Sequence, residues 1–191
     1  MAFPTLLFTL LFAAMPGANQ SLLVTDFSDT DANAGWRNVN DNVMGGRSDG
    51  QHRFEDDTMV LFGDISTNGG GFTSVRLPID QGTLAGMTHV TLRIKPDDRG
   101  PWRFIAYDAD QRRINYRIDL EPTGELGEWQ KVTIAMADMI PSWRGRPLSV
   151  ERYGRVEPSR IYQIGLILND TRDGPYELRV DRIEATSVDK S

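Results

Sequence analysis

The feature that most constrains the fold is a two-residue hydrophobic period that recurs along the chain after the first twenty residues. Val90, Leu92 and Ile94 alternate with Thr91 and Arg93, and later segments repeat this alternation. Residues spaced by two lie on one face of a β-strand, so each run predicts a strand with one buried face. Because turn residues rather than helical segments separate the runs, they predict an all-β antiparallel sandwich or jelly roll. The predicted strands are residues 22–27, 58–65, 72–79, 88–94, 102–107, 115–120, 129–136, 162–168 and 176–183.

One long region breaks this pattern. Residues 142–159 contain Pro147 and Pro158 and no alternating run, so we expect a loop without strands there. One helical turn at residues 137–140 is the only helical feature that the pattern allows, and Pro141 ends it. The chain shows no internal repeat and no linker, and its 191 residues suffice for a single domain.

The first residues predict an export signal. An apolar run covers residues 3–15, which is shorter than the about 20 residues of a membrane-spanning helix. Small residues follow the run as at a signal-peptide cleavage site, although no Lys or Arg precedes it. We therefore expect residues 1–18 to be a signal peptide and residues 19–191 to be the mature domain, periplasmic or secreted. The alternatives are a misassigned start codon and an uncleaved leader, which would give the chain a membrane anchor; any other membrane association would be indirect.

Composition excludes several function classes. The formal net charge is −6, so binding to a nucleic-acid backbone is not expected. The absence of cysteine removes thiol catalysis, disulfides and cysteine-ligated metals. The basic residues are 18 arginines and three lysines, which reflects either genomic composition or a need for fixed, paired contacts.

No group of residues predicts catalysis or metal binding. His52 and His89 are the only histidines, and we expect both at the surface without an orienting partner. The spacing of Asp29, Asp31 and Asn33 resembles a calcium loop, but its glycine comes one place late and position twelve is not glutamate. We therefore assign no catalytic residue, no metal and no cofactor.

Two glycine-marked segments carry polar and aromatic residues that strand packing does not require. They read Trp36-Arg-Asn-Val-Asn-Asp-Asn-Val-Met-Gly-Gly-Arg-Ser48 and Gly69-Gly-Gly-Phe-Thr-Ser-Val-Arg76. Asn and Asp side chains at this density either hold a turn by bonding their own backbone or bind a ligand. In the second segment Phe72 and Arg76 share a strand face with Ser74, and no Gly-Lys-Ser/Thr follows the glycines as in a phosphate loop.

The four tryptophans are expected in different environments. Trp129 lies in a predicted strand, and we expect it in the core. Trp143 and Arg144 lie in the long loop, where an exposed aromatic side chain stacks on a sugar or contacts a protein.

The order of these residues resembles the complex I intermediate-associated protein family. The similarity continues through Trp129-Gln-Lys-Val, Trp143-Arg-Gly-Arg and the closing strands, and covers residues 26–185. It implies a galactose-binding-like jelly-roll β-sandwich and a role as an assembly factor, since mitochondrial members assist the assembly of NADH:ubiquinone oxidoreductase. It implies no catalytic residues. It also places the two glycine-marked segments side by side, so that Arg76 would form a structural ion pair with Asp41.

Three functions remain open at this stage. The first is a non-enzymatic module that binds a protein partner, in the assembly of a membrane complex of the respiratory type. The second is a periplasmic or extracellular carbohydrate-binding module. The third is a hydrolase that uses carboxylates at strand ends, although no pair of them can be identified. The predicted binding residues are Trp36, Asn40, Asp41, Met44, Arg47, Ser48, Phe72, Ser74, Arg76, Trp143 and Arg144.

Overall fold

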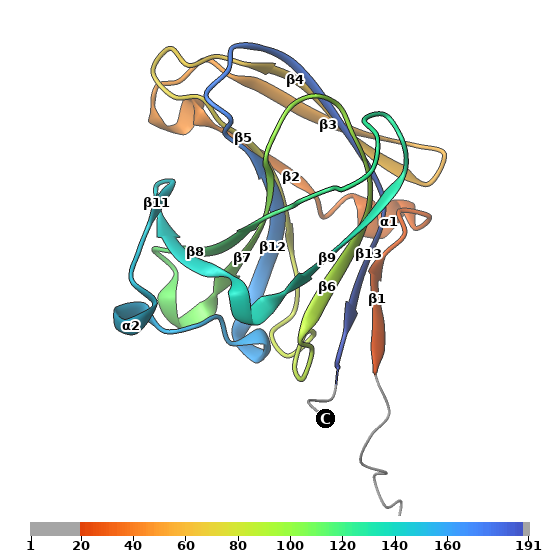
Figure 1. Ribbon diagram of the computed structural model, residues 1–191, viewed down its shortest axis with the longest axis vertical. Coiled ribbons are helices and arrows are strands. Elements are labelled where there is room, and N and C mark those ends of the chain that lie inside the picture. The colour runs from red at the N-terminus through yellow and green to blue at the C-terminus, as the bar shows by residue number, and fades with distance from the viewer. Residues whose placement is uncertain (1–19, 189–191) are drawn as a thin grey trace, which may run out of the picture.

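The computed structural model describes residues 20–188, which form two antiparallel β-sheets that face each other (Figure 1). The predicted signal peptide lies outside the described residues. Sheet A has the strand order β3-β4-β13-β6-β9, with β1 also paired to β13, and sheet B has the order β11-β10-β8-β7-β12-β5-β2. The strands are β1 (Ser21–Thr25), β2 (Arg37–Asn40), β3 (Asp49–Glu55), β4 (Thr58–Ile65), β5 (Thr73–Pro78), β6 (His89–Pro96), β7 (Trp102–Asp108), β8 (Asn115–Asp119), β9 (Gln130–Ala135), β10 (Ile140–Trp143), β11 (Arg146–Pro147), β12 (Ile161–Leu168) and β13 (Gly174–Thr186).

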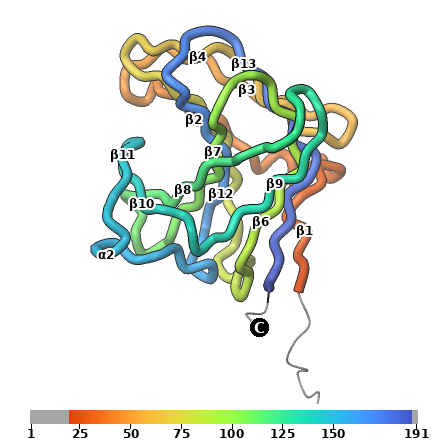
Figure 2. Tube along the Cα trace, viewed as in Figure 1, coloured from red at the N-terminus to blue at the C-terminus, as the bar shows by residue number. Residues whose placement is uncertain are grey.

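The last two strands in the sequence are interior strands, one in each sheet. In sheet B, β12 lies between β5 and β7, and in sheet A, β13 lies between β4 and β6. The first part of β13 pairs with β4 and its last part with β1, so β1 and the end of β13 lie side by side (Figure 2). Because both central strands come last in the sequence, neither sheet is complete until the chain has been traversed almost fully.

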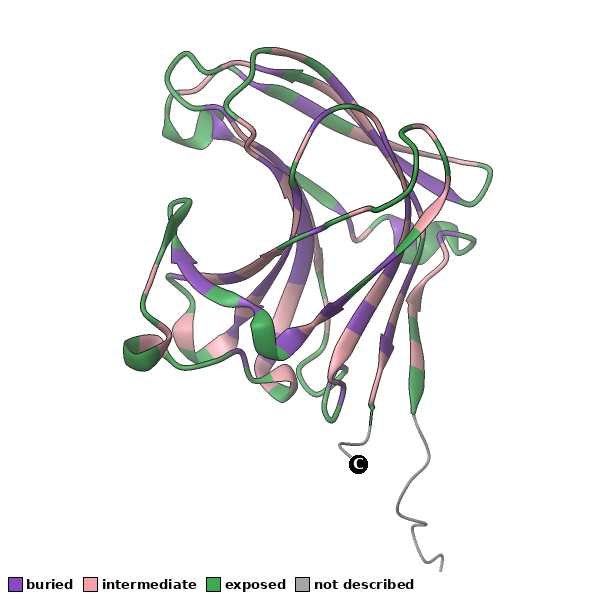
Figure 3. Ribbon diagram, in the orientation of Figure 1, coloured by how far each residue is buried: buried purple, intermediate pink, exposed green. Residues whose placement is uncertain are grey.

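The predicted two-residue period produces the core. Along β6, the side chains of Val90, Leu92 and Ile94 are buried, whereas their neighbours are partly exposed. Figure 3 shows buried residues alternating with intermediate and exposed ones along many of the strands. Burying the apolar area between the sheets is the main favourable contribution to the stability of such a sandwich.

The sequence prediction missed strands at the sheet edges. Strands β2 and β3 each lie at an edge of one sheet, and their mixed polar sequences have no continuous buried face. The strandless loop predicted at residues 142–159 was also wrong, because this region contains the end of β10, β11 and the single-turn helix α2 (Val150–Tyr153). Elements of two to four residues are too short to show a hydrophobic period.

Other local expectations had mixed outcomes. The helical turn expected near residues 137–140 is a 3₁₀ turn at Met136–Asp138. The prediction that Trp129 lies in the core was wrong: its side chain is partly exposed, and the Arg93 guanidinium lies 4.7 Å from its ring centroid. Trp129 immediately precedes β9, an edge strand, so no neighbouring strand covers it.

Candidate functional site

The carboxylate of Asp41 joins the two glycine-marked segments. It accepts hydrogen bonds from the backbone nitrogen (2.9 Å) and Oγ (2.6 Å) of Ser48, and from the backbone nitrogens of Gly71 (2.5 Å) and Phe72 (3.4 Å). The residue has no solvent exposure. Burial by itself would raise the pKa of Asp41, but these hydrogen bonds outweigh it and hold the pKa below its ordinary value. The carboxylate is therefore ionised at neutral pH and fixes residues 30 positions apart.

Two glycines allow this close approach. A Cβ atom on Gly46 would lie 2.2 Å from the Asp41 carboxyl carbon, and one on Gly70 would lie 2.3 Å from a carboxylate oxygen. No L side chain fits at such distances, so the glycines let the backbone wrap around the carboxylate. The Gly-Gly pairs thus have a structural explanation that does not involve a ligand.

The predicted ion pair between Asp41 and Arg76 is wrong. The Arg76 guanidinium lies over the Tyr107 ring, 5.0 Å from its centroid, and its Nε donates to Ser74 Oγ at 3.2 Å. The buried Asp41 carboxylate instead accepts four hydrogen bonds, from Ser48, Gly71 and Phe72.

The amide side chains of the first segment connect the two sheets. Asn38 and Asn40 on β2 both donate through Nδ2 to the backbone oxygen of Gly50 on β3, at 3.0 and 2.9 Å. The Asn40 Oδ1 atom accepts from Thr73 Oγ1 at 2.8 Å, and the Asn38 Oδ1 atom lies 2.7 Å from His52 Nδ1. These amides are used within the protein, so they position the segment.

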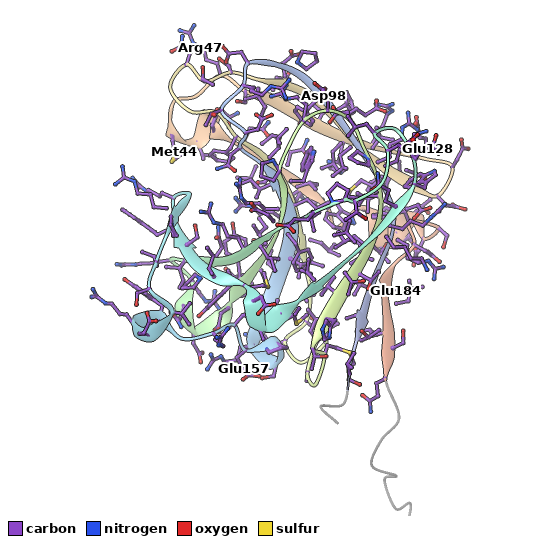
Figure 4. The ribbon with its side chains drawn as sticks, viewed as in Figure 1. Met44, Arg47, Asp98, Glu128, Glu157 and Glu184 are labelled. Atoms are coloured by element: carbon purple, nitrogen blue, oxygen red, sulfur yellow. The ribbon has the colours of Figure 1, made fainter. Side chains whose placement is uncertain are left out.

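Two further predicted binding residues, Trp36 and Ser74, also make contacts within the protein, whereas Arg47 is exposed. Trp36 is 2% exposed and packs with its ring centroid 6.0 Å from that of Phe27. Ser74 is buried and donates through Oγ to the backbone oxygen of Val39 at 2.8 Å. Arg47, three residues after Met44 in the first glycine-marked segment, is exposed. Figure 4 shows it pointing away from Met44 into the solvent.

A groove of about 520 Å³ lies on the face of sheet B that points away from the core. Its floor comes from the middle strands: Ile167, for example, lines the groove, while its neighbours Leu166 and Leu168 on β12 are in the core. The sheet-B groove brings together the remaining predicted residues. These are Met44, Phe72, Arg76, Trp143 and Arg144.

One rim of the sheet-B groove is the tight turn between β10 and β11. Trp143 pairs with Arg146, so Arg144 and Gly145 form a two-residue hairpin loop, and both have left-handed backbone conformations (φ 48° and 76°). This combination is that of a type I′ turn, whose twist matches that of the strands. Trp143 is 46% exposed, as expected, and the Arg144 guanidinium lies 5.0 Å from its ring centroid.

Sequence reasoning missed other polar and aromatic groove residues, among them Tyr107, Arg113, Asn115 and Asn169. For Tyr107 a signal existed, because it occupies the outward-facing parity of a predicted strand, where an aromatic residue has no packing role. The other three lie at strand ends or in loops, where no period indicates direction. The Asn115 Oδ1 atom and the Ser142 Oγ atom beside it on β10 are buried without a hydrogen-bond partner.

The residues that line the sheet-B groove include no Asp, Glu, His or Cys. Within residues 20–188, no three His, Cys, Asp or Glu side chains are grouped so as to hold a metal ion. The His89 side chain is hydrogen-bonded to that of Thr88, outside the groove. Asp29, the first residue of the calcium-loop-like spacing, caps the N-terminus of helix α1 (Thr30–Asn33) with its side chain. Among the strand-end carboxylates, Asp108 is fully buried and pairs with Arg160 at 3.0 Å, so it has a structural partner.

Comparisons with known proteins identify a family and a fold. The sequence model described as Complex I intermediate-associated protein 30 (CIA30) matches residues 25–180, whereas no curated protein matches the chain significantly. The family 11 carbohydrate-binding module of the cellulosomal cellulase Lic26A-Cel5E of Clostridium thermocellum has a TM-score of 0.64 at 14% identity, over 90% of this chain and 97% of that one. The agarase AgWH50C has a TM-score of 0.58 at 12% identity, over 88% of this chain and 25% of that one.

At these identities, structural similarity is evidence of fold alone. It confirms the predicted jelly-roll sandwich of the galactose-binding type. Within the residues that the structure describes, no helix has the length and apolar character needed to span a membrane.

Proposed function

Since the chain belongs to the complex I intermediate-associated protein 30 family, we propose that it is a non-enzymatic module that binds a protein partner in the sheet-B groove. The role is that of an assembly factor, for a membrane complex of the respiratory type. If residues 1–18 act as an export signal, the partner is met in the periplasm or outside the cell.

The observation that carries this proposal is a cluster of exposed apolar side chains. Residues 20–188 expose seven large hydrophobic side chains, and three of them, Val43, Met44 and Trp143, line the sheet-B groove. Figure 4 shows Met44 pointing toward the opening of the groove. Exposed Trp and Met side chains gathered at one concavity are typical of surfaces that bind proteins.

Site-specific photo-crosslinking tests this proposal. A benzophenone amino acid at position 44 or 143 is expected to capture the same discrete protein, and the capture from position 44 should disappear when Trp143 is replaced by alanine. The control position is 182, an exposed arginine on β13 in sheet A. Equal labelling from position 182, or no discrete product from either groove position, would contradict the proposal.

A carbohydrate ligand is the second candidate, favoured by the floor of the sheet-B groove. Phe72 and Tyr107 supply rings there, and Asn115 and Asn169 supply amides, a combination that suits sugar binding. Of the four tryptophans, only Trp143 lies in the groove, so saturable quenching of tryptophan fluorescence by a glycan is expected if this candidate is correct. Replacing Trp143 with phenylalanine should remove the quenching. A flat response across neutral and anionic glycans would exclude it.

A further inference from the structure

The arginines of the sheet-B groove differ from most others in how they are paired. Arg76, Arg113 and Arg144 line the groove, and none has a carboxylate partner among residues 20–188. Of the 15 other arginines, eight have a carboxylate partner among these residues. The arginines that have one are Arg53, Arg93, Arg99, Arg103, Arg160, Arg172, Arg179 and Arg182.

The lining of the groove is positive although the chain is acidic. Its residues include these three arginines and no Asp or Glu, while the whole chain has a formal net charge of −6. Asp41, next to the glycine-marked segments, is fully buried, and four hydrogen bonds from neutral groups stabilise its charge. Figure 4 shows the labelled carboxylates of Asp98, Glu128, Glu157 and Glu184 away from the groove in this view.

The same face carries further positive charge next to the groove. Arg37 on β2 is directly opposite Arg76 on β5. On β8, burial and then the neighbouring Arg103 lower the pKa of Arg117, although Asp119 partly offsets them. Arg103 thus disfavours the charged form of Arg117, and an anion bound on this face would be attracted by these arginines.

Two of the groove arginines already cover aromatic rings. The guanidinium of Arg76 lies over Tyr107 and that of Arg144 over Trp143, each 5.0 Å from the ring centroid. A ring face under a guanidinium is not free to stack on a sugar. Stacking leaves the N–H donors at the edge of the guanidinium available, and these suit a carboxylate. This arrangement favours an anionic peptide over a glycan.

We propose that the sheet-B groove binds an acidic peptide segment of the partner protein, with carboxylates on Arg76, Arg113 and Arg144 and an apolar side chain against Met44 and Trp143. This inference rests on the proposed function and specifies the chemistry of the partner. It follows that binding weakens as ionic strength rises, because exposed arginines attract carboxylates through a screened interaction.

Labelled synthetic peptides test the inference by fluorescence anisotropy. The probe is three repeats of Gly-Glu-Phe-Glu, and the matched peptides carry Gln or Lys in place of Glu. At 20 mM salt the Glu peptide is expected to bind about 10-fold more tightly than the Gln peptide, and the Lys peptide not to bind. Raising the salt to 200 mM should reduce affinity for the Glu peptide several-fold.

Matched variants show whether the groove is responsible. R76Q, R113Q and R144N should each weaken binding of the Glu peptide about 5-fold. Asn suits position 144 because it tolerates the left-handed conformation of the turn. R182Q on sheet A makes the same charge change outside the groove and should leave the affinity unchanged. Circular dichroism melts establish that each variant is folded.

The outcomes separate this inference from the proposed function. Equal binding of the Glu and Gln peptides, lost in W143A, would overturn the acidic-segment inference and leave a protein-binding groove. Binding of polygalacturonate but of no peptide, lost in R76Q, would overturn both. An effect of R182Q as large as that of R76Q, or no binding of the Glu peptide, would also overturn the inference.

Discussion

Replacing Asp41 with alanine is expected to lower the free energy of unfolding by about 4 kcal/mol. The substitution removes the acceptor of the backbone N–H groups of Ser48, Gly71 and Phe72. Those of Ser48 and Gly71 are buried, and a buried unsatisfied donor costs about 1–3 kcal/mol. Urea unfolding followed by tryptophan fluorescence measures the change. The exposed carboxylate of Asp80 provides the control: its replacement with alanine should change stability by less than about 0.5 kcal/mol. A similar loss in both variants would show that the hydrogen bonds to Asp41 contribute little.

The same carboxylate gives stability a defined pH dependence. The pKa of Asp41 is lowered in the folded state, so its contribution is fully present above the unfolded value of about 3.9. The contribution is lost as the pH falls through the lower folded pKa. Acid unfolding should therefore show a steeper loss of stability below pH about 4 in the wild type than in Asp41→Ala. Parallel profiles would contradict this assignment.

Replacing Arg99 with alanine is expected to lower the free energy of unfolding by a similar amount, about 4 kcal/mol. Arg99 and Asp170 form a buried ion pair, with Nε to Oδ2 at 2.6 Å and Nη2 to Oδ1 at 2.9 Å. The guanidinium also donates to the backbone oxygens of Arg172, Gly174 and Pro175. Removal of Arg99 leaves the Asp170 charge buried without its partner, which is costly in a poorly solvated site.

The exposed pair of Arg172 and Asp98 provides the comparison for Arg99. Its N–O distance is 3.1 Å, but both side chains are more than half exposed, so Arg172→Ala should cost less than about 1 kcal/mol. Thermal unfolding monitored by circular dichroism compares the two variants. Equal losses would mean that burial of the Arg99 pair contributes nothing. Asp170, the partner of Arg99, lies between Asn169 and Thr171, and both of these residues line the sheet-B groove. Arg99→Ala should therefore also weaken peptide binding.

The interior strands could be predicted because their apolar residues recur with a two-residue period. The alternation in β6 reflects one face packed in the core and one face turned outward, and in β12 the core face carries Ile164, Leu166 and Leu168. Strands β2 and β3 lack that signal, since edge strands need polar residues on the side that faces water. Their position depends on side-chain hydrogen bonds, such as those from Asn38 and Asn40 to Gly50, which have no sequence period.

The candidate site could be predicted only in part for a related reason. Glycines and an Asx-rich run mark unusual backbone, and in the structure Asn38 and Asn40 bond to the backbone of Gly50 while Asp41 bonds to Ser48 and the second glycine-marked segment. The sequence does not distinguish a residue whose side chain stabilises a turn from one whose side chain the turn exposes to solvent. Asp41 and Met44 lie in the same 3₁₀ turn, yet one is fully buried and the other 51% exposed. Only the fold brings Tyr107 and Asn169 to the same groove.

The hairpin that carries Trp143 and Arg144 lies at the outer edge of sheet B, and its strand β11 has two residues. Insertions or deletions at its tip would change the reach and chemistry of one rim without disturbing the strands that form the core. Loops of this kind accept changes in length at a small entropic cost. The groove can therefore diverge between relatives faster than the sandwich that supports it, and partner choice can change by the exchange of a few rim residues.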